Sequence, residues 1–191
     1  MASVKGTKTE KNLLAAFAGE SQARTRYTFF ASVAQKEGYE QISQIFLETA
    51  ENEKEHAKRF FSYLEGGMVE INAAYPAGII GNTLQNLKAA AEGENEEHTK
   101  LYPMFADIAA QEGFQEIAML FRNVAKVEVE HEKRYLKLAQ NIEKGEVFQK
   151  SSVVRWKCLN CGYVHEGPEA PEKCPSCLHP KAYFAIKEEN Y

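Results

Sequence analysis

Apolar residues recur along most of the chain with the spacing of amphipathic helices, and the pattern breaks at glycines. The spacing predicts four long helices, over residues 7–38, 39–64, 82–112 and 114–143. Thr7 and Glu10 form the Thr-x-x-Glu pattern of a capping box. Pro103 should kink the third helix, because proline removes a backbone donor and clashes with the preceding turn. Two tight connections and one long one predict a mainly α four-helix bundle with a crossover between helices 2 and 3.

The sequence also repeats itself at an offset of 75 residues. Between 34–59 and 109–134, eleven of 26 positions are identical, whereas average residue usage would give roughly one or two. Tyr27 and Tyr102 share this offset. We therefore expect two helix pairs related by a pseudo-twofold axis, so that the chemistry of one pair is presented again by the other.

The polar residues on the apolar stripes are of one kind. Helices 2 and 4 each carry a Glu-x-x-His motif, and helices 1 and 3 each carry one glutamate. Two side chains three residues apart lie about 4.5 Å apart along a helix, so both can reach one metal ion. Unpaired carboxylates in an apolar interior cost several kcal/mol each, and no lysine or arginine lies on these stripes. The pattern therefore predicts two metal cations, bound by Glu20, Glu53, His56, Glu94, Glu128 and His131.

The sequence pattern also singles out four residues near these ligands. Tyr27 lies two turns after Glu20 on the same face, and Tyr102 occupies the repeat position. Both tyrosines could hydrogen-bond to ligating carboxylates or simply pack in the core. Glu97 follows Glu94 by three residues, and its spacing fits either an additional ligand or a solvated edge residue. His98 lies one residue further round, and we expect it to be exposed.

All four cysteines lie between residues 158 and 177, as Cys158-x2-Cys161 and Cys174-x2-Cys177, with twelve residues between the two pairs. This spacing predicts a tetrathiolate metal site, with disulfides as the alternative. Zinc and iron both fit the spacing, and a one-electron carrier beside a dinuclear site favours iron. His165 and His179 are expected at the surface rather than as ligands. We expect two domains, an α-helical one over 1–146 and a cysteine domain over 153–191.

Charge and hydropathy narrow the set of partners. The formal net charge is −4, the sequence pI is about 5.8, and charges of both signs are interspersed. Nucleic acid and membranes are therefore poor candidate partners, and no apolar run approaches the ~20 residues of a membrane helix. The apolar stretch at 13–19 continues into Glu20 and Arg24 without a small-residue cleavage site, which favours a helix over a signal peptide. We expect a cytoplasmic protein.

In combination these motifs resemble the rubrerythrin family over essentially the whole chain. The motifs that carry the resemblance are Glu20, Glu53-Lys-Glu-His56, Glu94-Asn-Glu-Glu97, Glu128-Val-Glu-His131, Trp156-Lys-Cys158-Leu-Asn-Cys161-Gly162-Tyr163 and Cys174-Pro175-Ser-Cys177. The chain departs from free-standing rubredoxins in its shorter loop between the cysteine pairs and in Leu178, where glycine is usual. The resemblance implies a ferritin-like bundle with two irons in a carboxylate-bridged site, and a rubredoxin-like domain with one Fe(Cys)4 centre.

The resemblance also implies an activity. It points to a non-haem di-iron peroxidase that reduces hydrogen peroxide to water in oxidative-stress protection. Electrons would come singly through the Fe(Cys)4 centre from an external donor such as a rubredoxin or a reductase, and would cross between the subunits of a homodimer. Glu97 becomes an extra ligand, with one iron moving between His56 and Glu97 as the redox state changes, and Tyr27 and Tyr102 join it in the catalytic site. The alternatives are a ferroxidase or iron-handling protein with a structural cysteine domain, and a zinc-ribbon interaction module on a structural bundle.

Overall fold

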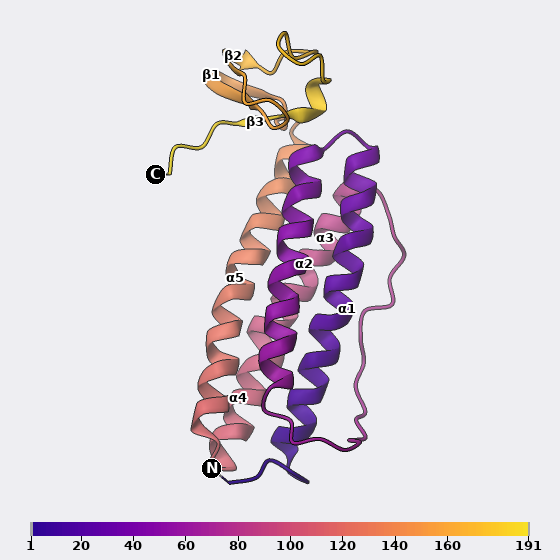
Figure 1. The fold of residues 1–191 in the computed structure, drawn as a ribbon, viewed down its shortest axis with the longest axis vertical. Coiled ribbons are helices and arrows are strands. Elements are labelled where there is room, and N and C mark those ends of the chain that lie inside the picture. Colours follow the sequence, from indigo (N-terminus) through magenta and orange to yellow (C-terminus); the bar gives the residue numbers. More distant parts are fainter. Residues whose placement is uncertain (1, 191) are drawn as a thin grey trace.

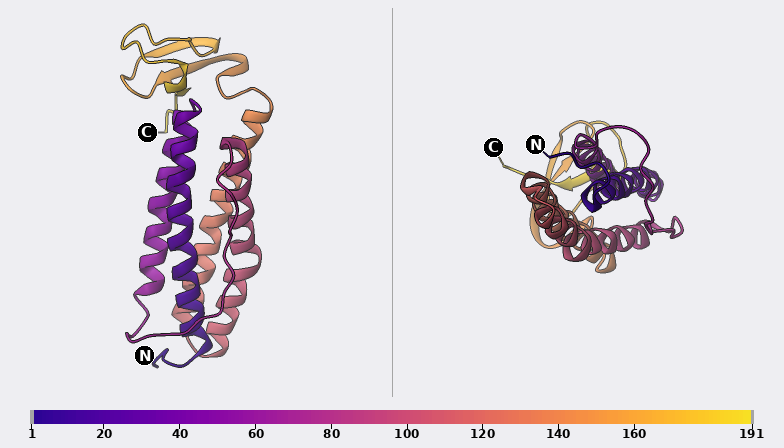
Figure 2. Two further views of the ribbon diagram at one scale, coloured as in Figure 1. Left: turned by 90° about the vertical axis from the view of Figure 1, so that its right-hand side faces the viewer. Right: turned by 90° about the horizontal axis from the view of Figure 1, so that it is seen from below.

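Two helical hairpins lie side by side in the computed structural model, which describes residues 2–190 (Figures 1 and 2). The helical elements are α1 (Lys8–Lys36), α2 (Glu40–Phe61), α3 (Thr83–Glu96), the π-helical η1 (Glu97–Leu101), α4 (Tyr102–Gln111) and α5 (Gln115–Glu143). The first hairpin pairs α1 with α2, and the second pairs the α3–η1–α4 segment with α5. Residues 62–82 lack regular secondary structure and run along the outside of the bundle (Figure 1). The predicted four-helix bundle with a long crossover is confirmed.

The helix ends follow the glycine signals, whereas the capping box forms only in part. Gly38 and Gly113 have positive φ angles of 83° and 89°, and each directly follows the C-cap residue of its helix. The Thr7 side chain accepts a hydrogen bond from the Glu10 N–H at 3.1 Å. The Glu10 carboxylate, however, accepts from the Gly6 N–H at 2.7 Å. The Thr7 N–H is unavailable to it because it donates to the Val4 carbonyl.

The break in the third helix is a π-helical turn directly before Pro103, rather than a simple kink at the proline. The Tyr102 N–H donates to the Glu97 carbonyl, five residues earlier. Tyr27 follows Glu20 by seven positions along the chain, but Tyr102 follows Glu94 by eight. Because a π turn takes up one more residue than an α turn, Tyr102 keeps the inward orientation of Tyr27. The widened turn also accommodates the proline ring, which clashes with the carbonyl four residues back in a regular α-helix.

The bundle core consists of two aromatic-rich clusters separated along the helix axis. On α2, Phe46 belongs to one cluster and Phe60 to the other, and on α5 Tyr135 and Phe121 divide in the same way. All four of these side chains are fully buried, and each buried phenylalanine contributes about 1.5–3 kcal/mol of hydrophobic free energy. The Glu-x-x-His motifs of both helices lie between these anchors. Packing above and below therefore holds a polar layer in a fixed position.

A small β domain sits against the end of the bundle where α1 turns into α2 (Figure 1). Its elements are β1 (Gln149–Cys158), β2 (Val164–Glu169), η2 (Lys181–Tyr183) and β3 (Phe184–Ile186), with antiparallel sheet order β2-β1-β3. Trp156 fills its core and donates from Nε1 to the Gly167 carbonyl at 3.0 Å. The rings of Tyr39 and Phe148 stack between bundle and β domain, with centroids 6.1 Å apart. Within residues 2–190, no helix is long and apolar enough to span a membrane.

Candidate metal centres

Four helices of the bundle each contribute one fully buried carboxylate to its interior. Glu20 on α1 and Glu128 on α5 are 0% exposed, and Glu53 on α2 and Glu94 on α3 are 1% exposed. Helical periodicity accounts for their orientation, since each lies on the apolar stripe of its own helix. Two clusters of ligand atoms, each spanning at most 4.8 Å, collect these residues: Glu20, Glu53, His56 and Glu128 in one, and Glu53, Glu94, Glu128 and His131 in the other. The structure thus brings together all six residues that the sequence predicted for the dinuclear site.

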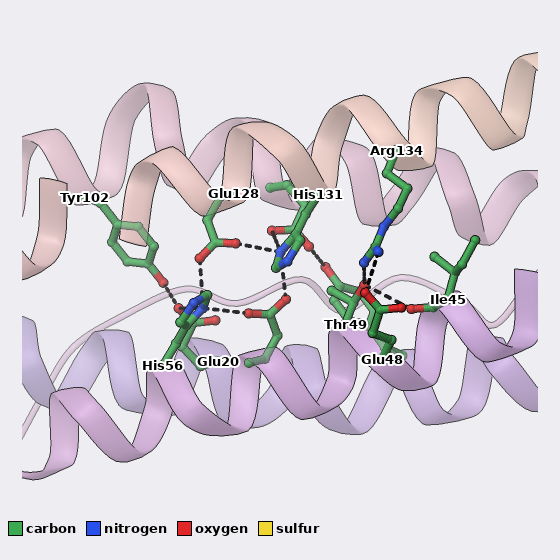
Figure 3. A network of polar contacts seen from close by, with 12 residues as sticks. Glu20, Ile45, Glu48, Thr49, His56, Tyr102, Glu128, His131 and Arg134 are labelled. Carbon is green, nitrogen blue, oxygen red and sulfur yellow. Dashed lines mark hydrogen bonds and ion pairs between the residues drawn. The ribbon is translucent and has the colours of Figure 1, made fainter. Parts of the chain in front are cut away.

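The two histidines share the two central carboxylates (Figure 3). His56 Nδ1 lies 2.9 Å from Glu53 Oε2 and 3.0 Å from Glu128 Oε1. His131 Nδ1 lies 2.8 Å from Glu128 Oε2 and 3.2 Å from Glu53 Oε1. Each central carboxylate therefore directs one oxygen toward each half of the site. This is the arrangement that lets a carboxylate bridge two metal ions.

Two buried tyrosines support the outer carboxylates across the bundle. The Tyr27 hydroxyl on α1 donates to Glu94 Oε1 on the facing helix at 2.5 Å. The Tyr102 hydroxyl on α4 donates to Glu20 Oε1 (Figure 3). Each helix that supplies an outer glutamate thus has a tyrosine donating to it from the opposite hairpin. Of the two roles left open by the sequence, the structure supports hydrogen bonding to these carboxylates.

The pKa values of Glu20, Glu94 and His56 are shifted in directions that lower the negative charge of the site. Burial, together with the charges of Glu97 and Glu53, raises the pKa of Glu20 well above its ordinary value. Burial also raises the pKa of Glu94 to about 8. Burial alone would lower the pKa of His56, but hydrogen bonds to Glu128 and Glu53 raise it to about 9. Carboxylates this close together repel one another when ionised, and a nearby cation stabilises their ionised form. The site therefore favours the binding of positive charge.

The donor set fits two metal ions. Glu20 Oε2 and Glu94 Oε2 are buried without a hydrogen-bond partner among the described residues. The Glu53 and Glu128 oxygens share the Nδ1 atoms of His56 and His131, each of which carries at most one proton. Buried polar atoms rarely stay unpaired, so these point to a missing partner. Carboxylate and imidazole ligands together suit first-row transition metals. The residues present therefore fit a carboxylate-bridged di-iron site.

Glu97 lies beside the six residues and belongs to neither ligand cluster. It occupies the first position of the π turn η1 and is half-buried. Its Oε1 atom is 4.0 Å from the position that a Cβ on Gly19 would take. Burial and the charges of Glu94 and Glu128 raise the pKa of Glu97 well above its ordinary value. Glu97 is thus close enough to the site for the charges of its carboxylates to act on it.

The sequence predicted an exposed His98, but the structure buries most of its side chain. Its Nε2 atom lies 2.6 Å from Glu132 Oε2, and its side chain is only 14% exposed. The other oxygen of Glu132 accepts a hydrogen bond from Asn95 Nδ2 at 2.9 Å. The Glu132 carboxylate on α5 therefore binds Asn95 and His98, which lie on either side of Glu97, the first residue of the π turn. Sequence reasoning missed Glu132, since its contact spans 34 residues and its own position carries no motif.

The four cysteine sulfurs converge in the β domain. Cys158 Sγ lies 3.7 Å from Cys177 Sγ, and Cys161 Sγ lies 3.6 Å from Cys174 Sγ. All four are free thiols, which disagrees with the disulfide alternative. Burial raises the pKa of the Cys158 thiol to about 11, whereas a backbone hydrogen bond from His179 lowers the pKa of Cys177 to about 6. The cluster fits an Fe(Cys)4 centre.

The two cysteine turns are alike except at one position. The Gly162 N–H donates to the Cys158 carbonyl at 2.8 Å, and the Leu178 N–H donates to the Cys174 carbonyl at 2.9 Å. Gly162 has φ 81° and Leu178 has φ 65°, a conformation that is strained for a residue with a side chain. As predicted, neither His165 nor His179 belongs to the sulfur cluster, and both are half-buried.

Comparisons with known proteins agree with this geometry. The family model for rubrerythrin matches residues 11–139, and the model for the rubrerythrin rubredoxin-like domain matches residues 156–185. Rubrerythrin of Porphyromonas gingivalis is 65% identical over 189 residues, covering 99% of this chain and 94% of that protein. Fully reduced nigerythrin has a TM-score of 0.63 at 33% identity, covering 97% of this chain and 92% of that chain. An open-pore ferritin from Archaeoglobus fulgidus shares the fold, with a TM-score of 0.61 at 19% identity over 73% of this chain and 88% of its own.

Binding of a divalent metal ion to metal-free protein at pH 7 should release protons from the bundle. His56 and His131, with pKa values raised to about 9 and about 12, carry protons at this pH, and a ligating imidazole nitrogen does not. Affinity should therefore rise with pH. Calorimetry in two buffers of different ionisation enthalpy measures the released protons. The matched His131→Gln variant should release fewer, because the thiol contribution is common to both proteins and cancels. Equal release from the two proteins would contradict the prediction.

Proposed function

Because the chain belongs to the rubrerythrin family, we propose that it is an oxidoreductase that reduces hydrogen peroxide to water. The observation that carries the proposal is the pairing of two different ligand sets on one chain. One set fits two irons and the other fits one iron. Reduction of peroxide to two waters takes two electrons, whereas an Fe(Cys)4 centre transfers one at a time. A dinuclear reaction site supplied by a one-electron carrier meets both requirements, and the proposed role is protection against peroxide in the cytoplasm.

Different residues of the bundle would bind different irons of this site. Glu53 and Glu128 would bridge the two irons, with Glu20 and His56 completing the ligands of one iron, and Glu94 and His131 those of the other. The Cys158, Cys161, Cys174 and Cys177 thiolates would hold the third iron. When bound, the iron pair supplies the two electrons that break the O–O bond. Glu97 would serve as an additional ligand in one redox state, since it lies within reach of the site but outside both clusters.

Tyr27 and Tyr102 would act through the carboxylates that they touch. Their hydroxyls donate to Glu94 and Glu20, which keeps one oxygen of each outer glutamate occupied and leaves the other free for metal. Burial and neighbouring carboxylates raise the pKa of both hydroxyls well above the ordinary value, so they stay protonated as donors. Such partners orient metal ligands and tune their basicity.

We infer from distance that electrons pass between the subunits of a homodimer. The β domain contacts the start of α2, while Glu53 lies thirteen residues further along that helix than Glu40. This corresponds to about 20 Å along the axis within one chain. A head-to-tail dimer would place each β domain nearer to its partner's reaction site. The external donor to the Fe(Cys)4 centre would be a rubredoxin or a reductase.

Cys158→Ser should abolish the visible absorption of the thiolate-bound iron and stop turnover with a donor that enters through this centre. The chemically reduced bundle should still react once with hydrogen peroxide, because its own ligands are intact. Stopped-flow absorbance under anaerobic conditions measures both reactions. Ser176→Ala, in the second cysteine turn but outside the sulfur set, is the control. Loss of the single reaction in Cys158→Ser would show that the two sites are not separable.

Glu97→Ala should retain both bundle irons, because the six residues of the two clusters remain. The reduced protein should nevertheless react with peroxide about tenfold more slowly or worse, as expected when one ligand that stabilises the oxidised state is lost. Metal analysis and anaerobic stopped-flow kinetics provide the measurements. Glu92→Ala, an exposed residue of the same helix, is the control. Unchanged peroxide kinetics would instead favour the ferroxidase alternative.

Mixed dimers test the route of the electrons. One chain carries Cys158→Ser and the other carries Glu53→Ala with His56→Ala, so that neither homodimer is active. Recovery of peroxidase turnover in the isolated heterodimer would show that electrons cross between subunits. Heterodimers that form but remain inactive would refute the route while leaving the proposed activity untouched.

A further inference from the structure

A cavity of about 720 Å³ lies between α1, the η1–α4 segment and the crossover segment 62–82. Glu97, Tyr27 and Tyr102 form part of its wall, so it reaches the residues that contact the buried carboxylates. A water molecule occupies about 30 Å³ of the liquid, and hydrogen peroxide has only two heavy atoms. The volume falls instead in the range of about 300–1,000 Å³ that holds larger organic ligands.

The walls of the cavity are apolar over three different elements. Ala16 of α1 faces it, as do Leu101, Phe105 and Ile108 of the η1–α4 segment and Ile71 of the crossover. The charged residues Lys8 and Lys11 also line it but are exposed to solvent. Near the metal site the wall carries Glu97 and Arg26, whose Nε atom is buried without a partner among the described residues. This distribution suits a molecule with an apolar body and a small polar group.

The crossover forms one wall of the cavity beside Glu97. The Tyr75 hydroxyl donates to the Ala15 carbonyl at 2.9 Å and fastens the crossover to α1. A Cβ on Gly19 would lie 3.7 Å from Tyr75 Cε1 and 4.0 Å from Glu97 Oε1. Tyr75 and Glu97 therefore approach the same point of α1, where glycine leaves free space. A ligand in the cavity would bring its polar group to this point.

We propose that this cavity admits organic hydroperoxides, with the –OOH group at Glu97 and the apolar group against the η1–α4 wall. The inference rests on the proposed peroxidase function and widens its substrate class. The reaction is R–O–O–H + 2 e⁻ + 2 H⁺ → R–OH + H₂O, in which the O–O bond breaks and two O–H bonds form. Both electrons come from the same external one-electron donor that supports hydrogen peroxide reduction.

Two exposed methionines allow a matched test with the iron-loaded dimer. Met104 lines the cavity, whereas Met119 lies on α5 outside it, and the two are 49% and 60% exposed. In Met104→Trp the larger ring should fill part of the cavity. The ratio of kcat/KM for cumene hydroperoxide to kcat/KM for hydrogen peroxide should then fall about tenfold or more, since filling an apolar pocket excludes larger substrates. In Met119→Trp this ratio should stay at the value of the unmodified protein.

Binding of the product provides a second readout that does not depend on turnover. Calorimetry with cumyl alcohol should show saturable binding to the unmodified protein and to Met119→Trp, and weaker binding to Met104→Trp. Reduction of hydrogen peroxide without reduction of cumene hydroperoxide would overturn the inference alone. A ratio that falls equally in both variants would also overturn it. Failure to reduce either peroxide would overturn the proposed function together with the inference.

Discussion

The burial of four carboxylates in one bundle is the constraint on which the rest of this structure depends. Ionised carboxylates cannot remain unpaired in an apolar interior, so two histidines and two tyrosines supply positive charge or hydrogen-bond donors. His56 and His131 each contact both central glutamates, and Tyr27 and Tyr102 donate to the outer ones. Glu20 Oε2 and Glu94 Oε2 still lack partners among the described residues and are available as ligands for the two irons.

Packing determines where this polar layer lies. Aromatic clusters above and below it hold α2 and α5 in register, so the two Glu-x-x-His motifs meet at one level. The internal repeat makes these two helices equivalent, and it makes the crossed tyrosine bonds equivalent as well. The bundle is therefore close to twofold symmetric at the ligands that hold metal.

Symmetry is broken on one side, and the proposed reactivity lies there. The extra residue of the third helical segment forms the π turn that carries Glu97, and Glu132 fastens this turn through Asn95 and His98. The crossover lies along the same side and forms one wall of the cavity next to Glu97. The β domain lies at one end of the bundle, which separates the cysteine cluster from the carboxylate site. Its own local asymmetry is Leu178, held at a positive φ in the turn that follows Cys177.

Local spacing determined much of this protein from the sequence alone. Three residues along a helix place Glu53 beside His56, and two residues between cysteines place two sulfurs on one metal ion, because both geometries arise within a single turn. Even the π turn has a signal, because Tyr102 follows Glu94 by eight positions whereas Tyr27 follows Glu20 by seven.

Only the tertiary structure decided the features that depend on packing between distant segments. The His98–Glu132 pair, the tyrosine bonds across the bundle and the cavity under the crossover each join segments at least 34 residues apart. The half-formed capping box shows the same limit, since the Val4 carbonyl had already taken the Thr7 N–H. Spacing along one element predicts which face a side chain occupies, whereas its partner depends on which other element packs against that face.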